Sequence, residues 1–312
     1  MSCRRLYATP LQAILILAAS QAHAAGPISP DSDILGIKLT MTRDQARALI
    51  ASSYPASKII DLPVQLGTPE YKKSATAGFT ADITSAEDQA NNQQKNQQAQ
   101  KEFQARQAAG FGNSPLNMSV ASPGDYGREQ IYVQVDPNDN STDIFGVSRY
   151  KEFSKAHAIP ANVLLQSYVE KYGQPSISQY GESFTWMAPG VVEKIKNPPV
   201  KCTLGSETDS YFYENAKNAS PNIISSSFVA AVNNIRAGDT LPYYNFTKCG
   251  TVLQLNLALS NDKQYAQSMS ATLIDLAKAR AEIKQFAADF VAHAGAAKQQ
   301  KLSTDSLNKP KL

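Results

Sequence analysis

The chain has 312 residues, and its 30 lysines and arginines against 27 aspartates and glutamates leave a formal net charge of +3. This near balance excludes the strongly basic field that marks a nucleic-acid-binding protein. The length is sufficient for one large domain or two small ones.

The first 24 residues have the pattern of a secretory signal peptide. Arg4 and Arg5 supply positive charge, residues 11–19 are almost wholly apolar, and Ala22 and Ala24 are small residues at the cleavage-determining positions. The apolar run is too short to cross a bilayer, which needs about 20 residues. No cysteine follows the run for lipid attachment. We therefore expect cleavage after Ala24, no transmembrane segment and no lipid anchor, and a periplasmic or secreted location.

Residues 26–83 are predicted to form an N-terminal strand–helix–strand unit. Thr42 and Gln45 match the capping box that begins a helix, in which each side chain satisfies the other residue's backbone N–H. Pro55 ends that helix, because the residue before a proline is pushed out of the helical region. Residues 58–66 then return as a strand.

Residues 84–125 form an insertion rich in glutamine and asparagine. Glutamine, alanine, lysine and glutamate favour a helix, but the segment has no apolar stripe with which to pack on a core. One interpretation is a mobile insertion or linker. The other is a partner-contacting helix, for which Phe103 is the one large apolar anchor.

Residues 126–294 are predicted to form the main α+β domain. Leu253, Leu255, Leu257 and Leu259 alternate with polar or small residues, which is typical of a strand with one buried face. In chain order we expect strands at 131–135 and 144–150, a helix from Pro160 that ends at Gly173, strands at 183–187, 251–259 and 269–275, and a helix from 276 to 290. The polar tail at 295–312 is expected to be disordered.

The fold class that follows is α+β, an antiparallel sheet with helices packed on one face. Two helices end alike, with Tyr54 before Pro55 and with Tyr172 three residues before Pro175. This similarity indicates a distant internal duplication into two related strand–helix–strand units.

The mature chain keeps two cysteines, Cys202 and Cys249. An even pair in an exported protein favours a disulfide, with two unpaired buried thiols as the alternative. Aromatic residues stand near both cysteines, and a disulfide would bring them together. They form either a binding surface or a cover of the disulfide, and the binding candidates are Tyr211, Tyr213, Tyr243, Tyr244 and Phe246.

Catalytic motifs are not evident in the sequence. His157 is the likeliest general base but has no nucleophile or acid at a diagnostic spacing. His293 is expected in the last turn of the C-terminal helix, where a cation is favourable. Asp136 and Asp139 flank a predicted hairpin turn. Asp136, Asn138 and Asn140 alternate like part of a calcium loop, but the required glycine and distal glutamate are missing. We therefore expect no cofactor and no metal, and these observations favour binding over catalysis without deciding between them.

Two stretches resemble a known family. DILGIKLTMTRDQARALIASSYP, residues 33–55, is similar to the opening of the BamE (SmpA/OmlA) group of envelope proteins, whose α+β fold is shared by beta-lactamase inhibitor proteins. LLQSYVEKYGQPS, residues 164–176, resembles the helix and Gly-x-Pro exit of similar exported proteins. The resemblance implies a non-catalytic binding or assembly module with helices on one face of an antiparallel sheet.

These observations together predict an exported protein of the bacterial envelope that acts by binding an envelope protein, a cell-wall component or another ligand. The first alternative is a secreted or periplasmic hydrolase that uses His157 as its base. The second is a secreted factor directed at a host.

Overall fold

A computed structural model describes residues 28–108, 127–137, 143–188 and 250–307 of the chain. Four helices and eleven strands have the following bounds: β1 Asp33–Ile34, β2 Ile37–Lys38, α1 Arg43–Ser53, β3 Lys58–Gly67, β4 Lys72–Asp82, α2 Ala86–Ala108, β5 Arg128–Val135, β6 Ile144–Glu152, β7 Ile159–Pro160, α3 Ala161–Tyr172, β8 Ile177–Gln179, β9 Ser183–Met187, β10 Thr251–Leu259, β11 Tyr265–Asp275 and α7 Leu276–Leu307. A short 3-10 turn, η2, covers Lys155–His157. The predicted α+β class is confirmed.

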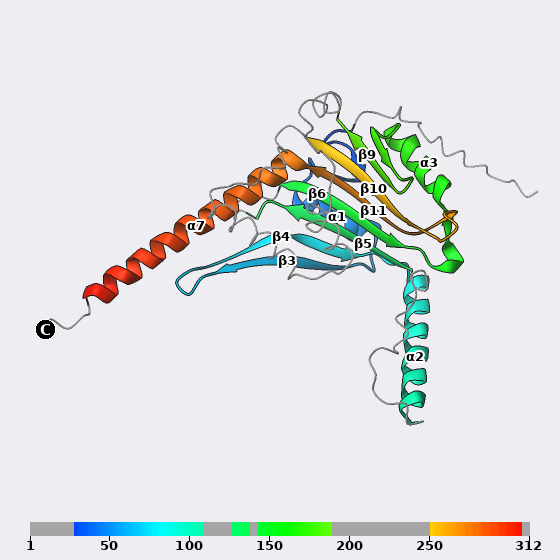
Figure 1. The fold of residues 1–312 in the computed structure, drawn as a ribbon, viewed down its shortest axis with the longest axis horizontal. Coiled ribbons are helices and arrows are strands. Elements are labelled where there is room, and N and C mark those ends of the chain that lie inside the picture. The colour runs from blue at the N-terminus through cyan, green and yellow to red at the C-terminus, as the bar shows by residue number, and fades with distance from the viewer. Residues whose placement is uncertain (1–27, 109–126, 138–142, 189–249, 308–312) are drawn as a thin grey trace, which may run out of the picture.

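The main sheet is antiparallel, and its strand order is palindromic. Along the sheet the order is β3-β4-β5-β6-β11-β10-β9-β8, with β7 paired to the start of β11. Each half therefore has four consecutive strands in simple succession, and the last strands of the halves, β6 and β11, pair antiparallel at the centre. Figure 1 shows this single sheet across the body of the molecule.

The two halves also share their order of elements. In the first half α1 precedes β3, β4, β5 and β6, and in the second α3 precedes β8, β9, β10 and β11. Each half has its long insertion at the same point, between its second and third strands, at residues 83–127 and 188–250. This arrangement agrees with the internal duplication that the two helix endings indicated. It also places the expected N-terminal unit in the same sheet as the main domain.

Local sequence signals begin and end the two equivalent helices. Thr42 and Gln45 form the predicted capping box at the start of α1, with bonds of 2.9 and 3.3 Å. Gly173 ends α3 with a φ of 80°, a conformation that glycine adopts without steric cost. The indole N–H of Trp186 donates to the Gly173 carbonyl at 2.7 Å, which ties β9 to the end of α3.

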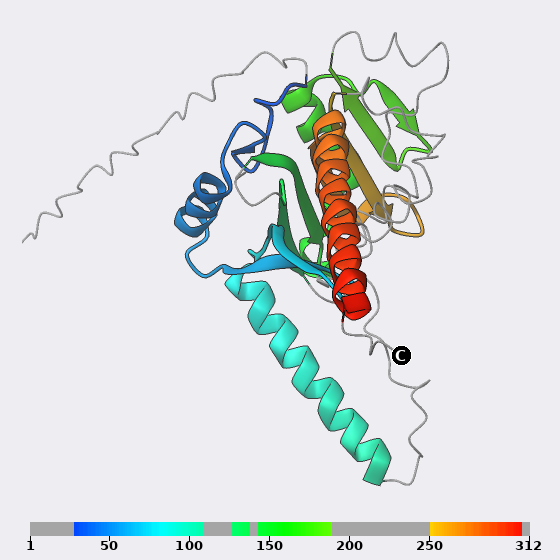
Figure 2. The same ribbon diagram turned by 90° about the vertical axis from the view of Figure 1, so that its left-hand side faces the viewer.

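Helices cover both faces of the sheet. Helices α1 and α3 pack on one face through Ile50, Leu164 and Tyr168, as expected for helices on a single face, but α7 does not join them. Helix α7 packs on the opposite face of the first half, where Phe286 and Phe290 contact a second buried cluster. Figure 2 shows α7 running along its own side of the sheet.

The strand β4 changes the face to which its side chains point at Gly78. Ala77 belongs to the cluster under α7, whereas Phe79 belongs to the cluster under α1 and α3. Gly78 has a φ of 147°, and a Cβ there would lie 2.0 Å from the carbonyl oxygen of Val133. Only glycine fits this position, because any side chain would collide with the neighbouring strand.

The structure shows how the polar insertion folds and corrects the prediction of a disordered C-terminal tail. The polar insertion forms the 23-residue helix α2, which projects away from the sheet (Figures 1 and 2). The tail expected to be disordered from residue 295 instead continues α7 to Leu307. Alanine, lysine and glutamine at 296–301 are good helix formers and extend a helix that is already anchored by packing. Among the described residues, no helix has the length and apolar character needed to cross a bilayer.

Candidate functional site

A cavity lies between α2 and one end of the sheet. It has a volume of about 610 Å³, within the range of about 300–1,000 Å³ that is common for ligand sites. The starts of β3 and β5 and the end of β4 form one wall, and α2 forms the other. Its described lining residues are Ala56, Lys58, Asp82, Thr84, Gln89, Asn92, Gln93, Asn96, Gln97, Gln100 and Arg128. We call this cavity the α2 groove.

One face of α2 carries a continuous row of carboxamides along the groove. The six helical residues that line it are all glutamine or asparagine, and they follow one another at alternating intervals of three residues and one residue from Gln89 to Gln100. With 3.6 residues per turn, such intervals keep the side chains on one side of the helix. Gln98 lies on the opposite side and donates to Glu102 at 3.1 Å.

The sheet contributes charge to the base of the groove. Lys58 begins β3 and Arg128 begins β5, and neither takes part in an ion pair with another described residue. Asp82 ends β4, and its carboxylate accepts the Thr84 backbone N–H at 3.0 Å. The base of the groove therefore holds two cations and one anion, with a formal charge of +1.

Helix α2 is fixed to the sheet at its N-terminal end. Ser85 caps it by accepting the backbone N–H of Asp88 at 3.0 Å. Gln89 donates to the Thr84 carbonyl at 2.8 Å, and Asn92 donates to the Gly127 carbonyl at 2.8 Å, where the chain enters β5. The Asn92 Oδ1 atom is buried, and no hydrogen-bond donor of the described residues reaches it. The N-terminal end of α2 is therefore bonded to the segments that precede and follow it in the sheet. The Asn92 Oδ1 atom in the groove accepts no hydrogen bond from another described residue.

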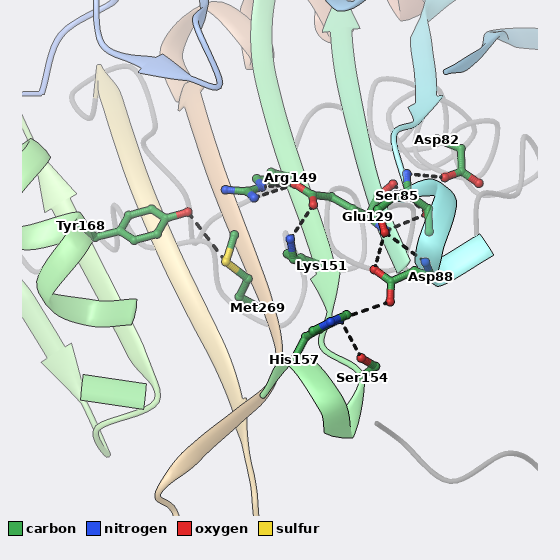
Figure 3. Close-up of polar contacts among 11 residues, drawn as sticks. Asp82, Ser85, Asp88, Glu129, Arg149, Lys151, Ser154, His157, Tyr168 and Met269 are labelled. Carbon is green, nitrogen blue, oxygen red and sulfur yellow. Dashed lines mark hydrogen bonds and ion pairs between the residues drawn. The ribbon is translucent and has the colours of Figure 1, made fainter. Parts of the chain in front are cut away.

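His157 lies on the other side of this base, in the 3-10 turn after β6. Its Nδ1 atom is 3.3 Å from the Ser154 hydroxyl and 3.7 Å from Asp88 Oδ1 (Figure 3). Its Nε2 atom is 3.7 Å from Glu87 Oε1. A serine–histidine–acid relay needs the nucleophile and the orienting acid on different ring nitrogens at hydrogen-bond distance. Here Ser154 and Asp88 share one nitrogen, and the carboxylates stand beyond that distance. The geometry suits attachment of α2, and His157 does not line the groove.

An ionic cluster lies on the sheet face that α1 and α3 cover. Glu129 accepts from Arg149 at 2.7 Å and from Lys151 at 2.7 Å, and its side chain is 14% exposed (Figure 3). The Glu129 backbone also bonds to Thr84, so the cluster connects to the segment that leads into α2.

Tyrosines from both helices surround Arg149. Burial raises the pKa of Tyr168 to about 12, against a smaller lowering by Arg149. Burial also raises the pKa of Tyr172, with Asp33 adding to the effect, and that of Tyr54, with Glu129 adding to it. These tyrosines are neutral at physiological pH and act as packing and hydrogen-bonding groups.

The structure separates the residues that the sequence singled out. Asp136 is buried at the end of β5, whereas Asp139 lies outside the described residues. His293 lies in the middle of α7, not in its last turn, because the helix is longer than expected, and its ring stacks on Tyr71 at 5.7 Å. Cys202, Cys249 and the five aromatic binding candidates, Tyr211, Tyr213, Tyr243, Tyr244 and Phe246, also lie outside the described residues, as does the predicted signal peptide.

Sequence reasoning missed the α2 groove. The signal was present, because the amides of the Gln/Asn-rich insertion recur at helical spacing from Gln89 to Gln100. This signal is not detected by the usual criterion for an amphipathic helix, which looks for apolar residues at helical spacing, and the segment has no apolar stripe.

Comparison of the chain with protein-family models, with curated proteins and with solved structures finds no match.

Proposed function

We propose that the protein is a non-catalytic binding module of the bacterial envelope, and that the α2 groove is its binding site. The observation that carries this proposal is the groove itself, with its carboxamide row on α2 and with Lys58 and Arg128, which form no ion pair with another described residue. A groove of this chemistry offers many hydrogen-bond donors and acceptors to a ligand.

The form of α2 supports a role in binding. Most of its 23 residues are exposed, so packing on the core does not account for its helical conformation. Capping and base contacts from Ser85, Gln89 and Asn92 hold one end while the row of amides extends beyond the sheet. A helix fixed in this way presents its polar side chains to a partner with less loss of conformational freedom than a loop.

Export to the envelope is part of the same proposal. It is supported by the charged, apolar and small-residue order of the first 24 residues, and by the resemblance of residues 33–55 to the BamE group. The hydrolase alternative has less support, because His157 shares one ring nitrogen between Ser154 and Asp88 and stands outside the groove.

Site-specific photo-cross-linking in the producing cell tests the proposal. Benzoylphenylalanine placed at Gln97 projects into the groove, and the matched control at Gln98 projects from the opposite side of the same turn. We expect a reproducible adduct with an envelope component from position 97 that position 98 does not give. Equal adducts from both positions, or none from position 97, would contradict the proposal.

A further inference from the structure

We propose that the ligand of the α2 groove is an extended peptide segment that carries a carboxylate at the base of the groove. This inference rests on the proposed function and names the class of ligand for the same site. It follows from three properties of the lining, which are the chemistry of the amides, the length of their row and the charge at its base.

The amides match a peptide backbone. Each carboxamide has two N–H donors and an acceptor oxygen, and each residue of an extended peptide presents one N–H and one C=O. An extended segment in a groove must replace the hydrogen bonds that it loses to water. The row from Gln89 to Gln100 supplies both kinds of partner, and the unused Oδ1 of Asn92 supplies an acceptor for a backbone N–H.

The length of the row fits a short peptide. The eleven residue steps from Gln89 to Gln100 correspond to roughly 16 Å of helix at about 1.5 Å per residue. An extended chain rises by about 3.3 Å per residue, so about five residues fit beside the row.

The charge at the base favours a single carboxylate. Lys58 and Arg128 have no ion-pair partner among the described residues, and guanidinium binds carboxylate through two parallel hydrogen bonds. Asp82 lies at the same base, so one carboxylate balances the formal charge of +1, whereas a dianionic phosphate would leave an excess negative charge there. The described lining contains no aromatic ring on which a sugar or base could stack. A peptide carboxylate is therefore the best match, from an acidic side chain or from a C-terminus.

A peptide library measures this preference on the full mature chain. The probe is a positional-scanning set of fluorescein-labelled hexapeptides with one position fixed as glutamate or glutamine and a C-terminus that is amidated or free. Fluorescence anisotropy gives the affinity of each pool. Comparison of the glutamate pools with the free C-terminal pools distinguishes the two sources of the carboxylate.

We expect pools with a carboxylate to bind about tenfold more tightly than amidated glutamine pools, the effect of one charge-assisted hydrogen bond. Lys58→Gln with Arg128→Gln should abolish this difference, whereas Lys72→Gln, an exposed lysine at the start of β4, should keep it. Gln93→Ala with Gln97→Ala should weaken all pools, and Gln94→Ala with Gln98→Ala should not.

Two results would overturn the inference. Equal binding of all pools would show that the groove does not prefer a carboxylate. Absence of binding to every pool would show that its ligand is not a peptide. If peptides fail while the cross-link from position 97 persists, the ligand is of another class and the proposed function stands. If both fail, the groove is not a binding site and both proposals are wrong.

Discussion

The hydroxyl oxygens of Ser148 and Thr272 lie 3.0 Å apart, on directly facing positions of β6 and β11. Both residues are buried, with exposed fractions of 2% and 5%. Their bond crosses the seam where the two halves of the palindromic sheet meet. It is therefore a polar side-chain contact that joins the two halves beside the strand ladder.

Removing one of these hydroxyls should cost more than removing both. Ser148→Ala leaves the Thr272 hydroxyl buried without this partner, and we expect the free energy of unfolding to fall by about 1–2 kcal/mol. Ser148→Ala combined with Thr272→Val should recover most of that loss. Urea unfolding of the two single variants and the double variant measures the coupling, and strictly additive losses would contradict it.

Glu129 is predicted to stabilise the ionic cluster beneath α1 and α3. Glu129→Gln leaves Arg149 and Lys151 without their carboxylate, with side chains that are 22% and 30% exposed. We expect a loss of about 2 kcal/mol in urea unfolding, because two half-buried cations then face each other. Glu182→Gln, which breaks the exposed pair with Lys263, should change stability by less than about 0.5 kcal/mol. Equal losses in the two variants would refute this account.

Tyr168 should make the protein sensitive to alkali. Its pKa is raised by burial to about 12, above the value of about 10 expected for an unfolded chain. The folded state therefore holds the phenolic proton more tightly, so this stability is full below pH 10 and is lost as the pH rises toward 12. Thermal unfolding between pH 9 and 12 should show a shallower decline for Tyr168→Phe. Tyr180→Phe, at a side chain 94% exposed, is the control and should follow the wild type.

Glu282 of α7 should limit stability near neutral pH. Burial raises the pKa of Glu282, and the neighbouring Asp136 raises it further by repulsion and by a hydrogen bond that favours the neutral form. The folded state thus favours the protonated carboxyl, and the associated stability is lost as the pH rises above the ordinary glutamate value of about 4.3. Glu282→Gln should raise the melting temperature at pH 7 and not at pH 3.5. An unchanged or lower melting temperature at pH 7 would count against the interpretation.

The sequence predicted elements whose signals are local. The capping box of Thr42 and Gln45 located the start of α1, and the alternating leucines at 253–259 located β10 to the residue. Gly173 marked the end of α3 for a steric reason that does not depend on the rest of the fold. These positions carry their own physical constraint, so they can be recognised without tertiary information.

Other features depend on contacts that the sequence does not reveal. The palindromic strand order requires the pairing of β6 with β11, which are more than 100 residues apart in the chain. The face of the sheet chosen by α7 depends on the change of direction at Gly78, which moves Ala77 to the α7 side. Neither pairing nor face follows from periodicity alone.

The candidate site was predictable in part. The composition of the Gln/Asn-rich insertion predicts helical propensity, and it is compatible with a partner-contacting helix as well as with a linker. The groove could not be foreseen, because Lys58 and Arg128 are 70 positions apart and meet α2 only through the β3-β4-β5 pairing. Phe103, the anchor considered from sequence, is 42% exposed and lies beyond the groove residues.

The most direct test of the binding account observes the amides of the groove themselves. Two-dimensional NMR of the protein, labelled with ¹⁵N-glutamine and assigned by single substitution, resolves the side-chain NH₂ groups of Gln93, Gln97 and Gln98. Titration with the tightest carboxylate-bearing hexapeptide pool should shift the Gln93 and Gln97 signals and leave the Gln98 signal in place. Shifts at Gln98 alone, or no shift at Gln93 and Gln97 at saturating peptide, would contradict the assignment of the α2 groove as the site of binding.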